Sequence, residues 1–139
     1  MIIYDKQDIK NALTKDMIFE IFQDLGGDPE VMPFGLISST ICHNMPGEGS
    51  RKLYFYDNTH LCKCYTGCDE PIFDIFELII KAMYIQKGLN FDLNDAIRWV
   101  AQKFGLSGTE EDYSSDFYLE DRKKLLEYER IQDIELNIV

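Results

Sequence analysis

The sequence predicts an α+β protein in which a small antiparallel sheet is flanked by helices. Three observations support this fold class. Apolar residues recur every three or four positions before residue 26 and after residue 71, which is typical of amphipathic helices. Residues 36–65 are rich in strand formers and are interrupted by turn residues. All four cysteines fall between residues 42 and 68, so their chemistry belongs to the predicted sheet.

The length and composition indicate a globular domain. The chain has 139 residues, of which 45% are hydrophobic and 28% are charged. No apolar run reaches the roughly 18–20 residues that span a membrane. The first ten residues also lack the basic and apolar segments of a signal peptide. We therefore expect a cytoplasmic protein that has no membrane partner.

The N-terminal part is expected to be helical over residues 5–25, with a break near Thr14. Thr14 is a suitable N-cap for a second helix, in which Met17 takes the third position. The glycine pair at 26–27 ends this helix. Residues 28–35 contain two prolines and a glycine, so we expect a loop there.

The central part is expected to form three strands. Residues 36–41 suit the first strand, and residues 44–50 have the composition of a turn. A hairpin follows, with strands near 52–56 and 60–65 joined by a turn at 57–59. Alternate residues of a strand face opposite sides of the sheet.

Two further helices are expected after this hairpin. The first follows Pro71 and is closed by Gly88, and the second covers about 92–104 and is closed by Gly105. Asn90 and Asp92 are both candidate caps for the second helix. We place one domain at residues 1–108, with a ribbon at about 36–70 and helices at about 71–105. Residues 109–139 are expected to form an acidic linker and a polar helix. The chain ends without a polar tail, so we expect it to continue past residue 139 into a further domain.

The cysteines and one histidine form a candidate metal site. Thiols stay reduced in the cytosol, so clustered cysteines indicate a metal more than disulfides. Structural zinc takes four sulfur or imidazole ligands in a tetrahedron. The five candidate ligands lie at the two ends of the hairpin: Cys42, His43, Cys62, Cys64 and Cys68.

The fourth ligand is open at this point. Cys64 and Cys68 flank a small loop, and His43 stands beside turn residues. Cys62 would point the same way as Cys64 on an extended strand. Cys42 can join its neighbour His43 only if the chain bends there, which the following NMPGEG segment allows.

The ribbon and the helix after it resemble the zinc-binding domain of bacterial and phage-type DNA primases. The residues that carry this resemblance are KLYFY at 52–56, CYTGC at 64–68 and IFDIFEL at 72–78, with a looser match at 95–101. The family pattern has Cys-x2-His, where this chain has Thr40 three positions before His43. It also has Cys-x2-Cys, where this chain has Cys-x3-Cys.

The resemblance implies a ligand set and a function. It assigns His43, Cys64 and Cys68 as zinc ligands and favours Cys42 as the fourth, with Cys62 in reserve. It implies a module with structural zinc that contacts the single-stranded DNA template and helps to start RNA primer synthesis in DNA replication. Its partners would be the primase polymerase domain and, as a second candidate, the replicative helicase. The polymerase domain would supply the catalytic site, because nothing in this chain resembles one.

The alternative is a zinc-ribbon adaptor that binds protein in a replication or transcription assembly. In that case, the acidic flanks of the ribbon would be the contact surfaces. The formal net charge of −11 argues against a uniformly basic surface for nucleic acid. However, residues 42–68 carry three basic and two acidic side chains, whereas residues 110–121 carry six acids and no base.

The candidate DNA surface is therefore the ribbon itself. Single-stranded DNA is bound by aromatic stacking beside positive charge. Lys52, Tyr54 and Tyr56 alternate along one predicted strand and would share one surface, while Leu53 and Phe55 face the core. The full set of candidate DNA contacts is Arg51, Lys52, Tyr54, Tyr56 and Lys63.

Overall fold

The computed structural model describes residues 2–106 and 108–110. The chain divides into two compact units, one of residues 4–107 and one that combines residues 1–3 with the chain from residue 108. In the second unit, β1 (Ile2–Ile3) pairs antiparallel with β7 (Thr109–Glu110). Thr109 and Glu110, which lie at the start of the expected linker, thus form a strand that the sequence did not indicate, because a strand of two residues has no alternating pattern. The polar helix expected after the linker lies outside the described residues.

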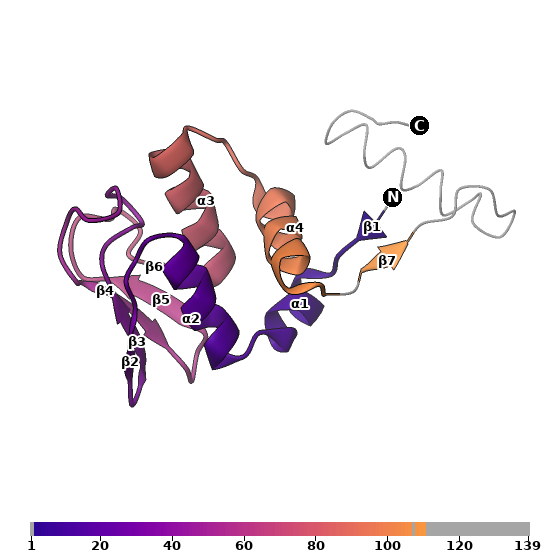
Figure 1. Cartoon of the computed structure of the whole chain (residues 1–139), viewed down its shortest axis with the longest axis horizontal. Helices are drawn as coiled ribbons and strands as arrows, with labels where there is room; N and C mark the ends of the chain where they lie inside the picture. The colour runs from indigo at the N-terminus through magenta and orange to yellow at the C-terminus, as the bar shows by residue number, and fades with distance from the viewer. Residues whose placement is uncertain (1, 107, 111–139) are drawn as a thin grey trace, which may run out of the picture. The chain divides into compact units, whose positions relative to one another are not determined.

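The unit of residues 4–107 confirms the α+β class. It contains an open antiparallel sheet of five strands in the order β2-β3-β4-β5-β6 (Figure 1). The strands are β2 (Glu30–Met32), β3 (Gly35–Ser38), β4 (Leu53–Tyr56), β5 (Leu61–Cys64) and β6 (Ile72–Phe73). The helices are α1 (Lys6–Ala12), α2 (Lys15–Asp24), α3 (Ile75–Lys87) and α4 (Leu93–Phe104). Helix α2 contacts β3, and helix α3 contacts β5 and α4.

The helices begin at residues whose side chains cap them. Thr14 accepts a hydrogen bond from the backbone N–H of Met17, which confirms the predicted break before α2. Asp92, rather than Asn90, caps α4 and exchanges hydrogen bonds with Asp95. Asp74 caps α3 in the same way, and its carboxylate also lies 3.2 Å from the ammonium group of Lys6 in α1.

Two strands correct the sequence-based expectations. Residues 30–32 form β2, although residues 28–35 were expected to be a loop, and residues 72–73 form β6. Both are short strands at the edges of the sheet, and β2 is mostly exposed, so neither shows the apolar alternation of a half-buried strand. The β2–β3 turn contains Pro33 and Phe34, which explains why the sequence there has turn character.

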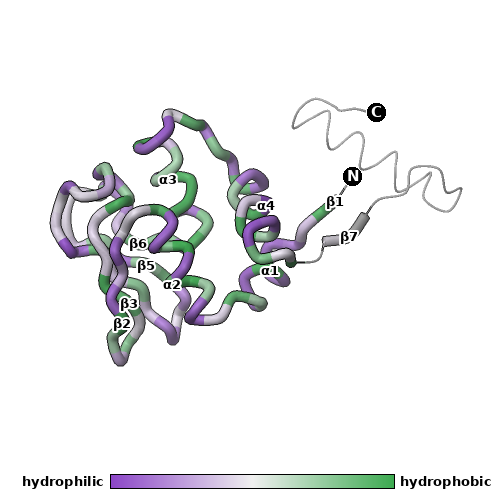
Figure 2. Tube along the Cα trace, in the orientation of Figure 1, coloured by the Kyte–Doolittle hydropathy of each residue, from purple (hydrophilic) through white to green (hydrophobic). Residues whose placement is uncertain are grey.

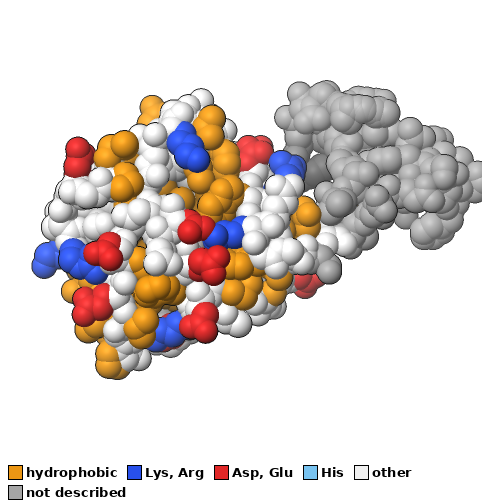
Figure 3. Space-filling model, in the orientation of Figure 1, with side chains coloured by type: hydrophobic (Ala, Val, Ile, Leu, Met, Phe, Trp, Pro, Cys, Tyr) orange, Lys and Arg blue, Asp and Glu red, His pale blue; other side chains and the backbone are white. Residues whose placement is uncertain are grey.

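The two faces of the sheet have different environments. The inner face packs against the helices through fully buried side chains that include Leu36, Leu53 and Phe55. Hydrophobic segments gather where α2 and α3 meet the sheet (Figure 2). On the face shown in Figure 3, acidic and basic side chains are interspersed among the described residues. The described residues therefore form no continuous acidic surface on that face.

Candidate metal centre

Two connections leave the same end of the sheet and carry the candidate ligands. Ser38 at the end of β3 pairs with Leu53 at the start of β4, and Leu53 pairs in turn with Cys64 at the end of β5. The β3–β4 connection, residues 39–52, carries Cys42 and His43. The β5–β6 connection, residues 65–71, carries Cys68. Strand register thus brings together residues that are up to 26 positions apart in the chain.

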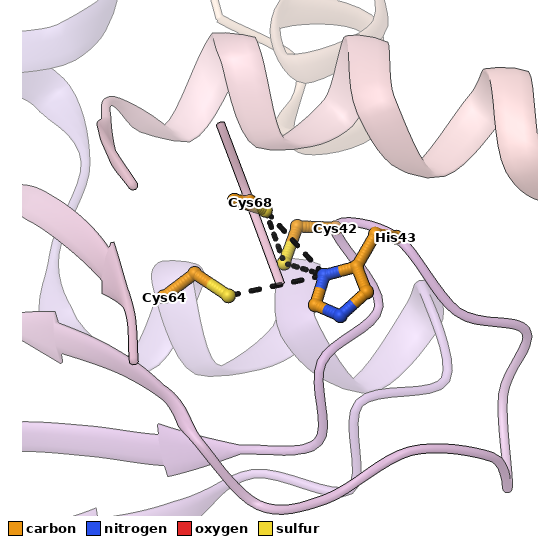
Figure 4. A group of neighbouring side chains, drawn as sticks. All are labelled: Cys42, His43, Cys64 and Cys68. Atoms are coloured by element: carbon orange, nitrogen blue, oxygen red, sulfur yellow. Dashed lines mark hydrogen bonds between the residues drawn. The ribbon is translucent and has the colours of Figure 1, made fainter. Parts of the chain in front are cut away.

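The four side chains point toward one another (Figure 4). The Nδ1 atom of His43 lies 3.3 Å from the sulfur of Cys42, 3.4 Å from that of Cys68 and 3.8 Å from that of Cys64. The sulfurs of Cys42 and Cys68 are 3.5 Å apart, and all four ligand atoms lie within 4.8 Å of one another. Metal–sulfur bonds of about 2.3 Å and a metal–nitrogen bond of about 2.1 Å in a tetrahedron would place these atoms about 3.6–3.8 Å apart. The four residues can therefore bind a metal ion.

The first turn explains how two adjacent residues reach one site. Thr40 is fully buried, and its backbone oxygen accepts hydrogen bonds from the N–H groups of His43 (3.2 Å) and Asn44 (3.0 Å). Its hydroxyl accepts a further bond from the side chain of Asn44, and its N–H donates to the backbone oxygen of Ser50. These bonds make the bend that the NMPGEG segment allowed. Thr40, which stands where the resembled family has a cysteine, thus shapes the turn.

The second turn is held at its base by two backbone hydrogen bonds. The N–H of Cys64 donates to the oxygen of Pro71 (2.8 Å), and the N–H of Tyr65 donates to that of Lys52 (2.9 Å). Gly67 lies in this turn with φ of +87°, which favours glycine. A Cβ atom at Gly67 would lie 2.7 Å from Nε2 of His43, so the imidazole packs closely against the turn.

Cys62 lies outside this group, although it is on the same face of β5 as Cys64. Its side chain is fully buried, and the residue pairs with Phe55 on β4 and Phe73 on β6. Burial raises the pKa of its thiol, and the charges of Asp74 and Glu77 add to this effect. Cys62 is therefore a cysteine of the hydrophobic core, which leaves Cys42 as the fourth member of the cluster.

The cluster is partly withdrawn from water, which affects its thiols. Burial raises the pKa of Cys42, and its neighbours Cys68 and Cys64 raise it further. Burial also raises the pKa of Cys68, which the hydrogen bond to Cys42 and the positive charge of Lys81 offset only in part. A bound cation would reverse this preference for the protonated form, because metal binding requires thiolates.

The outer face of the sheet, next to the metal centre, carries a cluster of four aromatic rings. We call this the aromatic cluster: Phe34, Tyr54, Tyr56 and Tyr65. Phe34 stacks on Tyr54 with 5.6 Å between ring centroids, and the hydroxyl groups of Tyr56 and Tyr65 are 2.5 Å apart. This hydrogen bond raises the pKa of Tyr56 to about 12.

The basic residues predicted to bind DNA are placed in different ways. Lys63 pairs with Tyr54 in the sheet register and so lies on the same face, with its ammonium group 4.8 Å from the ring centroid of Tyr65. Lys52 is exposed at the start of this face. Arg51 instead donates to the backbone oxygen of Asp28 and lies near the Asp28 and Glu30 carboxylates. Its guanidinium group is therefore engaged with the Asp28–Glu30 segment.

Two members of the aromatic cluster were absent from the predicted contact set. Phe34 was missed because its turn belongs to a segment expected to be a loop, although an aromatic residue between Pro33 and Gly35 is a usable signal. Tyr65 lies in the CYTGC segment that carries the resemblance. However, its place beside Tyr54 depends on the fold of the metal-binding loop, with 4.8 Å between the ring centroids.

The fold and the cluster define an α+β protein with a candidate metal centre of three cysteines and one histidine. The chain is 35% identical over 140 residues to the SPbeta prophage-derived uncharacterized protein YorJ of Bacillus subtilis (strain 168). The match covers 97% of this chain and 36% of YorJ, so the chain spans about a third of the relative's length. No protein-family model and no solved structure matches the chain. Within the described part, no helix has the length and apolar character required to cross a membrane.

Proposed function

We propose that this chain is the zinc-binding, template-recognition module of a DNA primase, which contacts single-stranded DNA and helps to start RNA primer synthesis. The observation that carries this proposal is the position of the cluster. Three cysteines and a histidine lie at one end of a sheet whose outer face carries aromatic rings and lysines. The resemblance to the primase zinc-binding domain covers the same residues.

Zinc is the metal that the donor set favours. Three thiolates and one imidazole form a common structural zinc site, whereas magnesium and calcium prefer oxygen ligands. Four protein ligands complete a tetrahedron and leave no position for a substrate, so the zinc would be structural. It would join the turn of Cys42 and His43 to the loop of Cys68, whose connections share a backbone hydrogen bond at their base, from Tyr65 to Lys52.

The aromatic cluster and its lysines are the proposed DNA contact. Stacking on aromatic rings is tolerant of sequence, and lysines beside the rings attract the phosphates. Lys52 and Lys63 are the cations least engaged with acidic groups among the predicted contacts, because Arg51 is paired. Two such contacts predict weak binding that depends on salt. The logarithm of the association constant should fall with the logarithm of the salt concentration with a slope of about −1.4.

The proposed partners lie outside this chain. YorJ is almost three times as long as the segment it shares with this chain, which leaves room for further domains in that protein. Primer synthesis would be performed by a polymerase domain, in the same chain or another, with a replicative helicase as a second partner. The chain beyond residue 110 would form the connection.

Metal analysis and oligonucleotide binding test the proposal. We expect one zinc ion per chain, and stronger binding of a labelled single-stranded 12-mer than of its duplex by fluorescence anisotropy at low salt. Lys52→Gln should weaken this binding and leave the zinc content unchanged. A folded protein without metal, or one that does not bind the single strand at low salt, would contradict the proposal.

The primase role needs a second test on a longer protein. Purified YorJ can be assayed for ribonucleotide incorporation on single-stranded templates, with and without the segment that matches this chain. We expect initiation to be lost when this segment is removed. Incorporation that is absent from intact YorJ, or unchanged by the deletion, would argue against the role in primer synthesis.

The alternative function, a protein-binding adaptor, is favoured by a separate observation. Three large apolar side chains are exposed near the α3–α4 connection, namely Tyr84 in α3, Leu89 in the connection and Leu93 at the start of α4. Exposed apolar groups of this kind are common at protein interfaces. An intact zinc site in a protein that binds no single-stranded DNA would favour the adaptor.

A further inference from the structure

Tyr65 differs from the other rings of the aromatic cluster in its exposure. Its side chain is 48% exposed, whereas Phe34, Tyr54 and Tyr56 are partly buried and cover one another. A nucleobase needs a free ring surface on which to stack. Of the four rings, Tyr65 therefore offers the largest surface to a base.

The orientation of Tyr65 is set by three contacts. Its ring meets that of Tyr54 edge-on with 4.8 Å between centroids, and its hydroxyl shares a hydrogen bond with that of Tyr56. Its backbone N–H donates to the oxygen of Lys52. A ring held in this way loses little conformational entropy when a base stacks on it, which favours binding.

Tyr65 also stands between two members of the metal cluster. Cys64 precedes it directly and Cys68 follows three residues later. Residues 65–67 are exposed, so little apolar packing holds this loop. A metal ion bound to both cysteines would anchor both ends of the loop and so restrict the position of the ring.

A cation lies beside the same ring. The ammonium group of Lys63 is 4.8 Å from the ring centroid, and Lys52 is joined to the backbone of Tyr65 by the hydrogen bond described above. An aromatic ring with the ammonium group of Lys63 beside it matches the base and phosphate groups of a nucleotide.

We infer that Tyr65 is the principal base-stacking residue of this surface, and that metal binding holds it in place. This inference rests on the proposed function, which places single-stranded DNA on the aromatic cluster. It assigns a smaller role to Tyr54 and Tyr56, which support the ring of Tyr65. It also makes DNA affinity depend on metal through one identified side chain.

The first test compares three variants of the whole chain. The probe is a fluorescein-labelled single-stranded thymidine 12-mer at low salt. Tyr65→Leu should lower the affinity by about 5- to 150-fold, the range that corresponds to loss of one stacked base. Tyr65→Phe keeps the ring and should stay within about threefold of the parent. Tyr84→Leu removes a tyrosine that is 59% exposed on α3 and should leave the affinity unchanged.

The zinc content shows whether a variant loses DNA affinity directly or through damage to the metal centre. All three variants should keep one zinc per chain and the circular dichroism of the parent. If Tyr65→Leu weakens DNA binding only together with loss of zinc, the tyrosine stabilises the site, and the inference is overturned. If Tyr65→Leu binds as the parent does, the inference fails while the proposed function stands. If the parent itself does not bind the oligonucleotide, both fail.

The second test examines the dependence on metal. Removing zinc with a chelator should weaken DNA binding by the parent more than by Tyr65→Leu, because the variant has already lost the positioned ring. Circular dichroism at the helical bands should show that α1 to α4 persist under these conditions. An equal loss in both proteins, with the helices intact, would show that metal acts through other residues and would overturn this part of the inference.

Discussion

The helices α3 and α4 and the two cysteine-bearing connections belong to one compact unit but are held by different forces. The helices have capped ends and bury apolar faces that include Phe76, Ile79 and Val100. In contrast, residues 45–52 are exposed, as are residues 65–71 apart from Cys68. Hydrophobic burial therefore stabilises the helical side. The metal-binding end is buried mainly at the start of the first connection, around Ile41, and otherwise depends on hydrogen bonds and on its ligands.

The helical side and the metal-binding end can therefore be perturbed separately. A metal ion contributes its binding free energy mainly where the chain has little other support, because structural zinc binding is coupled to local folding. A large apolar side chain contributes where packing is dense. Changes at the metal cluster and in the core should therefore have distinguishable signatures.

The largest effect is expected from removal of one ligand. Cys68→Ser should abolish stable zinc binding, since structural sites in small domains bind with apparent free energies of about 10–16 kcal/mol that need all four ligands. Hydrogen exchange should then accelerate in residues 39–52 and 65–71, while the backbone amides of α3 stay protected. Metal analysis and exchange mass spectrometry measure these outcomes.

The control for this prediction is Ser39→Ala, which lies in the other cysteine-bearing connection, residues 39–52, and outside the cluster. Its hydroxyl donates to the backbone oxygen of Gly27, so a small loss of stability without loss of zinc is expected. Unfolding of the whole unit by Cys68→Ser would contradict the separation of the two parts.

The next effect concerns the helical side. Phe76 is fully buried in α3, so Phe76→Ala should lower the free energy of unfolding by about 3–5 kcal/mol through loss of burial and the cavity that remains. Chemical denaturation followed by circular dichroism measures this change. The variant should still bind one zinc per chain as long as it folds, and a folded variant without zinc would show that the two parts are coupled.

The helical half of the fold was predictable because its signals are local. Thr14 and Asp92 cap helices whose apolar faces recur at the helical period, and both helices lie where the sequence indicates. In contrast, β2 and β6 were missed, because short edge strands are defined by their partners and carry little pattern of their own. The pairing of Ile2–Ile3 with Thr109–Glu110 is between segments more than 100 positions apart, which no local pattern reveals.

The candidate site was partly predictable for the same reason. Spacing and turn composition indicate five candidate ligands, and the resemblance favours Cys42 over Cys62 as the fourth. The structure brings together the ligand atoms of Cys42, His43, Cys64 and Cys68. Spacing alone does not distinguish Cys62 from Cys42, because alternation puts Cys62 on the same face as Cys64. The structure excludes Cys62 because it lies within the sheet, between Phe55 and Phe73, and not at the end where the other ligands meet. This position depends on the register of β5 with β4 and β6.

The third prediction concerns pH and the metal-binding end. Because the pKa values of Cys42 and Cys68 are raised, both thiols hold protons at neutral pH, and metal binding must release at least these two. Zinc affinity should therefore fall as the pH falls, by at least about 100-fold per pH unit below neutrality. Competition with a chelating dye of known pH dependence measures the slope. A slope of less than one proton would indicate that the thiols are already ionised before metal binds.

The smallest effect is expected at Cys62. Its substitution tests whether the core and the metal-binding end differ even within one strand. Cys62 and Cys64 are two residues apart in β5 and face the same side, but Cys62 packs against Phe55 and Phe73 in the core while Cys64 reaches the metal cluster. Cys62→Ala removes one buried sulfur atom and should lower the free energy of unfolding by about 1–2 kcal/mol.

The zinc content should decide between the two cysteines. Cys62→Ala should keep one zinc per chain with the affinity of the parent, whereas Cys64→Ala, the matched variant, should lose it. Denaturation and metal analysis on both variants measure the two quantities independently. Loss of zinc from Cys62→Ala in a folded protein would contradict this prediction. It would mean that Cys62 binds the metal or supports its ligands, although its side chain is buried in the core.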